Sequence, residues 1–247
     1  MKYLFAFMAA AAVFASPVPA GAQGRGQQAR PAEPKAAAPI DLTGYWVSLI
    51  TEEWRWRMVT PPKGDYASIP MTNAAKAAAD KWDPAKDEAD GEQCRGYGAA
   101  AIMRLPERLH ITWEDNNTLR IDTDTGTQTR LLHFGQPAPP DTVPSWQGYS
   151  LARWDFSARR GTTGGQLNVT TTKMKPGYLR KNGIPYSANA ALTEYFNRVT
   201  EDNGDEYVVV TTIVDDPMNL TQTFVTSSQY KKVPDATGWA PTPCSAK

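Results

Sequence analysis

The sequence contains few of the residues that common catalytic and metal centres require. Histidine and cysteine occur only twice each, as His110, His133, Cys94 and Cys244. There is no glycine-rich phosphate loop, no nucleophile elbow and no Cys-x-x-Cys pair, so local signatures of nucleotide binding, α/β-hydrolase chemistry and dithiol redox chemistry are missing. The two histidines fall on separate expected strands, and no motif supports Ser-His-Asp catalysis. We therefore expect no resident metal and no cofactor.

An excess of charge of one sign is also missing. Lysine plus arginine and aspartate plus glutamate each number 26, so the formal net charge is +0. A nucleic-acid partner is therefore not expected, because such proteins carry a basic surface. Beyond the N-terminus no segment is long and apolar enough to span a membrane. The sequence leaves the oligomeric state open.

The N-terminus has the features of a secretory signal. Lys2 supplies a positive start, residues 3–15 form an apolar run, and Ala20-Gly21-Ala22 fits the small-x-small cleavage rule. We expect a signal peptide over residues 1–22, cleavage before Gln23, and a periplasmic or secreted protein. Residues 23–39 are rich in Gln, Ala, Pro and Gly and predict a disordered linker. Residues 40–247 then form a single domain.

The expected export affects the predicted state of the two cysteines. An even count in an oxidising compartment favours a disulfide between Cys94 and Cys244, with two free buried thiols as the alternative. Closing so long a loop contributes about 4–5 kcal/mol to stability in the chain-entropy model. The bridge would hold the C-terminal tail against the middle of the fold.

Alternation of apolar and polar residues indicates an all-β fold. Residues 146–155 and 165–172 predict two antiparallel strands joined by a hairpin loop at 157–164, and residues 190–199 and 206–214 predict a second pair. Further short strands are expected at residues 41–50, 99–104, 108–113, 118–123, 128–134 and 220–232. One short helix is expected, over residues 72–82. The pattern predicts an antiparallel lipocalin-like barrel, with a β-sandwich as the alternative, and Gly44-x-Trp46 resembles the opening strand of lipocalin-type barrels.

A strand is also expected at residues 52–60, where tryptophan and arginine alternate. Trp54, Trp56 and Met58 would lie on one face, and Arg55 and Arg57 on the other. This arrangement has two interpretations. It would form an aromatic wall with an arginine row for an anionic or carbohydrate-like ligand, or a core face with solvated arginines outside.

A spaced pattern extends over roughly residues 94–244. Its elements are Cys94, Met103-Arg104-Leu105-Pro106, Trp146-x-Gly148-x-Ser150-x-x-x-Trp154, Leu167-x-Val169, Gly183-x-Pro185-x-Ser187, Glu194-x-Phe196, Asp216-Pro217 and Cys244. This pattern resembles a widespread family of secreted bacterial proteins that has no settled reaction. Members of that family carry histidine at the positions of Tyr149 and Tyr186, and glutamate at the position of Glu194. The paired change to tyrosine implies one shared pocket, capable of acid–base chemistry but poor for metals; the alternative is two separate packing tyrosines.

These features predict an exported protein with one ligand cavity in the barrel. Its apolar walls are predicted to be Trp46, Trp54, Trp56, Trp146 and Trp154. Its polar contacts are predicted to be Tyr149, Tyr186, Glu194, Arg55 and Arg57. The protein would bind a small amphipathic or aromatic molecule. Alternatively, it would be a cofactor-independent lyase, isomerase or hydrolase, with Glu194 as base and a tyrosine as acid or oxyanion donor.

Overall fold

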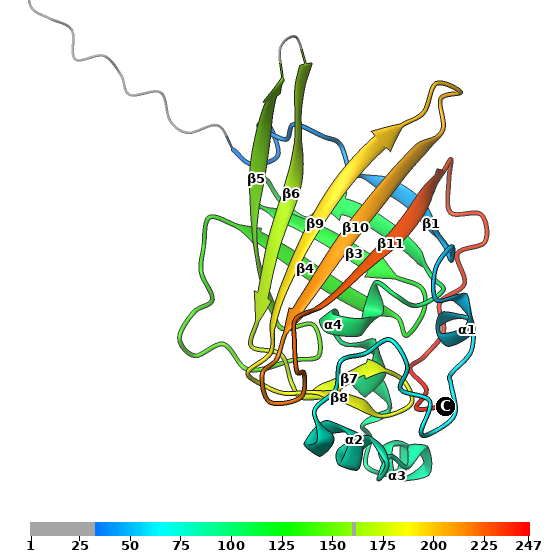
Figure 1. The fold of residues 1–247 in the computed structure, drawn as a ribbon. Coiled ribbons are helices and arrows are strands. Elements are labelled where there is room, and N and C mark those ends of the chain that lie inside the picture. Colours follow the sequence, from blue (N-terminus) through cyan, green and yellow to red (C-terminus); the bar gives the residue numbers. More distant parts are fainter. Residues whose placement is uncertain (1–32, 160–161) are drawn as a thin grey trace, which may run out of the picture. The chain divides into compact units, whose positions relative to one another are not determined.

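The computed structural model describes residues 33–159 and 162–247. The predicted signal peptide and linker residues 23–32 lie outside the described residues. Nine strands form a closed barrel in the order β1-β11-β10-β9-β6-β5-β4-β3-β2 (Figure 1). The barrel strands are β1 (Gly44–Leu49), β2 (Arg108–Trp113), β3 (Thr118–Thr123), β4 (Gln128–Phe134), β5 (Tyr149–Arg159), β6 (Thr162–Thr172), β9 (Ala191–Thr200), β10 (Glu206–Asp215) and β11 (Phe224–Val233). The predicted lipocalin-like barrel is confirmed, and the β-sandwich alternative is wrong.

Neighbouring barrel strands are antiparallel with one exception. An odd number of strands cannot alternate in direction all the way round a closed sheet, so one neighbouring pair must be parallel. That pair is β4 and β5, which align Leu132 with Ser150 and Phe134 with Ala152. The proline-rich connection between them, residues 135–148, crosses from one strand end to the other and makes this parallel pairing possible.

Short helices and a small second sheet lie at one end of the barrel (Figure 1). Strands β7 (Gly177–Arg180) and β8 (Ile184–Tyr186) pair with each other. The helices are α1 (Trp54–Arg57), α2 (Asn73–Ala79), α3 (Pro84–Ala89), α4 (Ala99–Ile102) and the 3-10 helix η1 (Gln93–Tyr97). The helix predicted over residues 72–82 is confirmed as α2, whose N-cap Thr72 accepts a hydrogen bond from the Ala75 amide. No helix of the described residues is long and apolar enough to cross a membrane.

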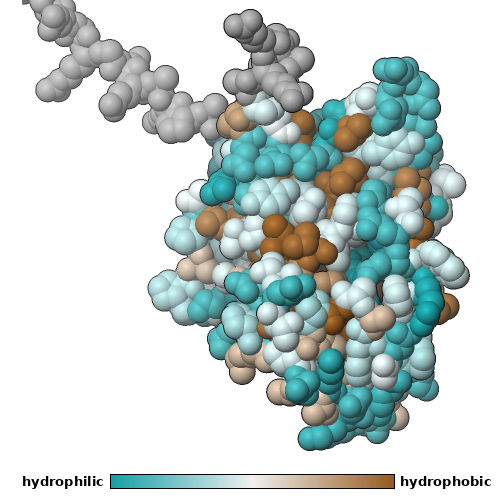
Figure 2. Space-filling view, viewed as in Figure 1, coloured by the Kyte–Doolittle hydropathy of each residue, from teal (hydrophilic) through white to brown (hydrophobic). Residues whose placement is uncertain are grey.

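Buried apolar side chains form two clusters in the part of the chain that the structure describes. The larger occupies the barrel interior, where inward-facing residues such as Leu109, Ile111 and Phe196 are fully buried. Trp46 lies in this cluster and donates its indole N–H to the Leu42 carbonyl at 2.9 Å. The smaller cluster joins α2, β7 and β8 to the adjoining end of the barrel. On the face shown in Figure 2, hydrophobic residues are interspersed among hydrophilic ones.

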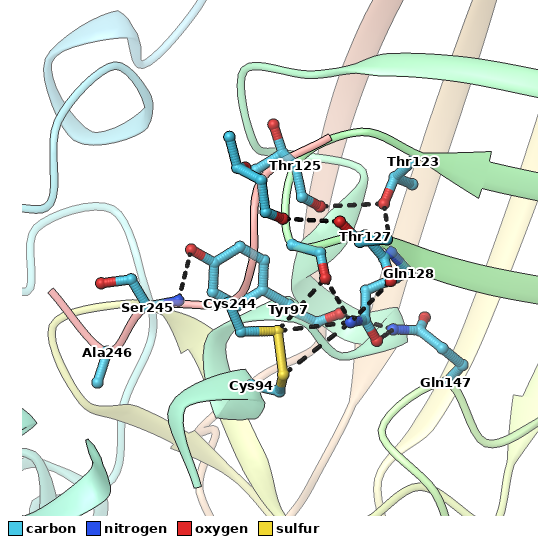
Figure 3. The surroundings of a disulfide bond; sticks show 12 residues. Cys94, Tyr97, Thr123, Thr125, Thr127, Gln128, Gln147, Cys244, Ser245 and Ala246 are labelled. Carbon is cyan, nitrogen blue, oxygen red and sulfur yellow. Dashed lines mark hydrogen bonds between the residues drawn. A yellow bond between two sulfur atoms is a disulfide. The ribbon is translucent and has the colours of Figure 1, made fainter. Parts of the chain in front are cut away.

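The predicted disulfide between Cys94 and Cys244 is confirmed. Figure 3 shows Gln128 beside it, with the Gln128 amide donating to the Gly126 carbonyl at 2.7 Å and accepting from Gln147. A Cβ on Gly126 would lie 2.3 Å from the Tyr97 ring, and its φ of +74° favours glycine. The disulfide therefore fixes both the C-terminal tail and the segment that carries Tyr97.

Two sequence expectations for the fold are wrong here, and a third, the strand at residues 52–60, is described with the site. Residues 99–102 form α4 and residues 103–104 a turn rather than a strand, because three successive alanines favour a helix and show no alternation. The expected hairpin loop at 157–164 is mostly strand, with Ser157 paired to Gly164. Within the described part of the expected linker, the Pro34 carbonyl accepts from the Trp154 indole at 2.8 Å and the Lys35 amide donates to the Asn116 carbonyl.

Candidate functional site

A loop over residues 53–68 closes beside the barrel. Both of its end residues have left-handed backbone conformations, with φ of 51° at Glu53 and 68° at Ser68. Such values are uncommon for residues other than glycine and are kept only where surrounding contacts hold them. The Ser68 hydroxyl donates to the Glu53 carboxylate, which also forms a salt bridge with Arg104. These contacts close the loop at its neck, as in an Ω-loop.

The strand expected at residues 52–60 is wrong, because this segment winds into α1. The Glu53 carbonyl accepts hydrogen bonds from the Trp56 and Arg57 amides and so starts the helix. The helical turn contradicts both interpretations of the alternation. Trp54 and Met58 are 66% and 55% exposed, so they form neither a ligand wall nor a core face, whereas Arg57 is only 6% exposed. An arginine of this segment therefore faces inward, and two of its large apolar side chains face solvent.

Buried contacts account for the inward position of Arg57. Its Nε donates to the Arg104 carbonyl at 2.8 Å, and its Nη2 lies 3.4 Å from Ser228 Oγ on β11. The loop is also held from β7: Arg180 donates to the Ala67 carbonyl and to Ser68 Oγ, both at 3.1 Å. The conformation of the loop is thus specified by arginines that lie far apart in the sequence.

Three guanidinium groups are therefore buried together. Arg57 and Arg104 are each 6% exposed, and Arg180 is 5% exposed. Burial lowers the pKa of Arg57 and of Arg104, and burial together with the charge of Arg104 lowers the pKa of Arg180 to about 10. All three remain cationic at neutral pH. Among the described residues, Glu53 is the one carboxylate with a salt bridge to any of them.

A pocket of about 130 Å³ opens onto these cations, and we call it the arginine pocket. Arg57, Arg104, Arg180 and Lys181 line it together with an apolar wall that includes Trp56 and Tyr97. Two cations lie over aromatic rings: Arg180 is 5.3 Å from the Trp56 ring centroid, and Lys181 is 5.0 Å from that of Tyr97. Among the described residues that line the pocket, none is acidic. The arginine pocket therefore combines an apolar wall with four cations, and the carboxylate that pairs with one of them, Glu53 with Arg104, is not among its lining residues.

A second pocket, of about 350 Å³, lies on another side of Arg57 and Arg104. It is lined by Glu52, Glu53, Ser68 and the polar residues at the start of β11. Its two carboxylates balance its two arginines, so it has no surplus charge to attract an ion. The arginine pocket is the more distinctive site, although it is the smaller.

Glu194 lies inside the barrel, where it forms a buried ion pair. Arg130 donates to both carboxylate oxygens, at 3.1 Å and 2.5 Å, and the two side chains are fully buried. Thr171 and Ser150 extend this polar group, with their hydroxyl oxygens 2.7 Å apart. A carboxylate that is paired in this way and fully buried is out of reach of a substrate in solution.

The predicted shared pocket of Tyr149, Tyr186 and Glu194 is wrong. Its neighbours Ser150 and Ala152 are buried, so Tyr149 faces outward on β5, where its hydroxyl donates to the Gln136 carbonyl at 3.0 Å. Tyr186 lies on β8 in the smaller apolar cluster, and burial raises its pKa. A residue in a strand cannot share a face with its neighbour, and Tyr149 and Glu194 fall on opposite faces of the barrel wall.

The predicted tryptophan walls also separate. Trp46 fills the barrel interior, and Trp154 lies 5.3 Å from Phe134 between ring centroids. Trp146 lies beside Lys175. Of the predicted site residues, only Trp56 and Arg57 line the arginine pocket, and Arg55 lies against the Trp56 ring.

Sequence analysis missed Arg104, Arg180 and Lys181. Arg104 follows an alanine-rich segment that shows no alternation, and Arg180 and Lys181 lie at the end of β7 and in the turn after it, within a strand pair too short to be recognised by period. The one signal for Arg104 was its place in the Met103-Arg104-Leu105-Pro106 element of the spaced pattern, which was not assigned to the site.

The two histidines lie apart and stack on aromatic rings. His110 stacks on Tyr45 with ring centroids 4.1 Å apart, and His133 stacks on Tyr149 at 4.6 Å. Within the described residues, no group of three or more His, Cys, Asp or Glu side chains is arranged to hold a metal ion. Comparisons with protein-family models, with curated proteins and with solved structures found no match. Any function for this chain must therefore be argued from the site.

Proposed function

We propose that this protein binds a small amphipathic anion in the arginine pocket. The observation that carries the proposal is the convergence of Arg57, Arg104, Arg180 and Lys181 on an apolar wall, with no acidic residue among the described lining residues. Small-molecule sites commonly combine an apolar lining with a few convergent polar groups. Here all the charged groups of the lining are cations, which favours a negatively charged ligand.

Burial strengthens the expected interaction with an anion. Cations withdrawn from water are costly unless paired, and the lowered pKa values of Arg57, Arg104 and Arg180 express that cost. An arriving carboxylate would relieve it and would accept charge-assisted hydrogen bonds, with the planar fork of arginine matching its two oxygens.

The size of the pocket indicates the scale of the ligand. An engineered apolar cavity of about 150 Å³ in another protein holds a benzene molecule. At about 130 Å³, the arginine pocket suits one aromatic ring or a short branched chain, with the acidic group toward the arginines. Benzoate is therefore a suitable probe.

This proposal places the ligand outside the barrel interior. The inward-facing side chains of the barrel pack against one another and include the buried Arg130–Glu194 pair. We also propose export through the predicted signal peptide, since the disulfide fits an oxidising compartment. N-terminal sequencing of the exported protein should give Gln23 as its first residue, and an uncleaved N-terminus would contradict export by this route.

Calorimetric titration tests the binding proposal. Benzoate should bind, and benzyl alcohol and benzylamine, which have the ring without the negative charge, should bind at least tenfold more weakly. Arg104→Gln should weaken benzoate binding by about tenfold or more, because it removes a hydrogen bond to a charged group worth about 1.5–3 kcal/mol. Lys181→Gln should weaken it by a few fold.

Lys76→Gln is the matched control, because it removes the same charge from the exposed face of α2. The Lys76→Gln variant should bind benzoate with the same affinity as the wild type. Thermal unfolding must show that Arg104→Gln is folded at the assay temperature. Equal binding of benzyl alcohol and benzoate, or equal losses in Lys181→Gln and Lys76→Gln, would contradict the proposal.

A further inference from the structure

Glu107 lies directly after the segment that lines the arginine pocket, and its surroundings define its protonation state. The Tyr230 hydroxyl oxygen lies 2.8 Å from the Met103 carbonyl oxygen and 2.9 Å from Glu107 Oε1. A phenol carries one proton and can donate only one full hydrogen bond. Were Glu107 ionised, both neighbours would be acceptors and one of the two contacts would lack a proton. A protonated Glu107 supplies the missing proton by donating to the phenol oxygen, while Tyr230 donates to Met103.

The burial of Glu107 supports the same state. Its side chain is 4% exposed, and its Oε2 has no hydrogen-bond partner among the described residues. The titratable and charged groups that act on it are Tyr230 from β11, Asp124 after β3, Arg130 on β4 and Arg57 on α1. Burial is the largest influence on the pKa of Glu107 and raises it well above the ordinary value, although the hydrogen bond with Tyr230 lowers it; the charge of Asp124 raises it further.

The two arginines do not reverse this effect. Arg130 is committed to Glu194 through both of its terminal nitrogens. Arg57 bonds to the Arg104 carbonyl and to Ser228, and no salt bridge joins it to a carboxylate in the described residues. A neutral Glu107 therefore leaves the charge of Arg57 available on the side of the arginine pocket.

We propose that the arginine pocket binds its anion only while Glu107 holds a proton, so that anion binding and protonation of Glu107 are coupled. This inference rests on the proposed function. An ionised Glu107 would place a carboxylate beside Arg57 and Tyr230, reduce the positive charge of the site and repel an incoming anion. Coupling is reciprocal, so the bound anion must in turn raise the pKa of Glu107.

The direction of the pH dependence follows. Below its pKa, Glu107 is neutral and the affinity for benzoate is high. As the pH rises through that pKa, Glu107 loses its proton and the affinity falls. Within that range, binding of one benzoate is accompanied by net uptake of protons, which calorimetry in buffers of different ionisation enthalpy measures directly.

Two variants isolate the effect. Glu107→Gln preserves the shape and, through its amide N–H, the donor to Tyr230, but it cannot ionise. Its benzoate affinity should stay within twofold over the pH range in which wild-type affinity falls severalfold. Glu201→Gln, in the exposed turn between β9 and β10, is the matched control and should follow the wild type.

Infrared spectroscopy detects the proton on the Glu107 carboxyl group in the ligand-free protein. At a pH above the ordinary glutamate pKa of about 4.3, the carbonyl stretch of a protonated carboxylic acid should be present in the wild type and in Glu201→Gln, and absent in Glu107→Gln. Absence of the band from the wild type would overturn the proposal. So would identical pH profiles of benzoate binding in the wild type and Glu107→Gln. If the band is present but benzoate does not bind at any pH, the proposed function fails while the assignment of the proton stands.

Discussion

At the scale of single residues, two buried glutamates behave in opposite ways. Glu194 is paired in bidentate fashion with Arg130, whereas Glu107 contacts a phenol and has one oxygen without a partner among the described residues. The ion pair with Arg130 requires a charged Glu194, whereas the contact with the Tyr230 phenol requires a neutral Glu107. Both side chains are buried, and the ion pair with Arg130, which Glu194 has and Glu107 lacks, accounts for the difference between them.

Matched substitutions of the two glutamates should therefore give different stabilities. Glu194→Gln leaves the Arg130 charge buried and unpaired, and it should lower the free energy of unfolding by about 3–5 kcal/mol. Glu107→Gln should cost far less at low pH. Denaturant unfolding of both variants at one pH measures the difference, and equal losses would contradict it.

The pH dependence of the second variant has a definite sign. The folded-state pKa of Glu107 is raised above its unfolded value, so its contribution to stability is fully present below the unfolded pKa of about 4.3 and is lost as the pH rises through the folded pKa. Relative to the wild type, Glu107→Gln should thus gain stability as the pH rises. A constant difference in unfolding free energy across pH would show that Glu107 titrates normally.

At the scale of elements, the 53–68 loop depends on contacts at its neck. Glu53 and Ser68 hold left-handed conformations and hydrogen-bond to each other, and Glu53 pairs with Arg104. Asn182 holds the far part of the loop by donating to the Asp65 carbonyl at 2.9 Å. A loop held by a few polar contacts opens more readily than the strands beside it.

Glu53→Gln should loosen this loop without unfolding the barrel. The substitution keeps the shape but removes the charge that pairs with Arg104, and limited proteolysis should then cleave within residues 53–68 several times faster than in the wild type. Glu88→Gln, an acidic residue of α3 outside the loop, serves as the control. Cleavage at the same rate in all three proteins would show that the ion pair does not hold the loop.

At the scale of the whole molecule, the sequence predicts the barrel better than the site. The structural bounds of β2, β3 and β4 coincide with the expected strands at 108–113, 118–123 and 128–134, because alternation and turn residues mark both ends of each. The disulfide was predicted from the cysteine count together with the expected export signal, and the structure contains it. Such signals are local or compositional, so a single sequence contains them.

The site could not be predicted in the same way. Three elements that lie far apart in the sequence bring the arginines together: α1 carries Arg57, the segment after α4 carries Arg104, and β7 carries Arg180. No regular spacing in the sequence predicts that these side chains line one pocket. Alternation at 52–60 suggested a strand because a four-residue helix is too short to show its own period. The resemblance that linked Tyr149, Tyr186 and Glu194 grouped residues that face in different directions.

The central claim is that an amphipathic anion binds in the arginine pocket rather than inside the barrel. Nuclear magnetic resonance of the indole N–H groups tests it most directly, because the eight tryptophans give few signals and lie in distinct places. The Trp56 indole donates to Asp65 at 3.0 Å beside the pocket, and Trp56→Phe assigns its signal. We predict that benzoate shifts the Trp56 signal and leaves those of Trp46 and Trp154 in place. Shifts of Trp46 or Trp154 with Trp56 unmoved would place the ligand in the barrel and contradict the claim.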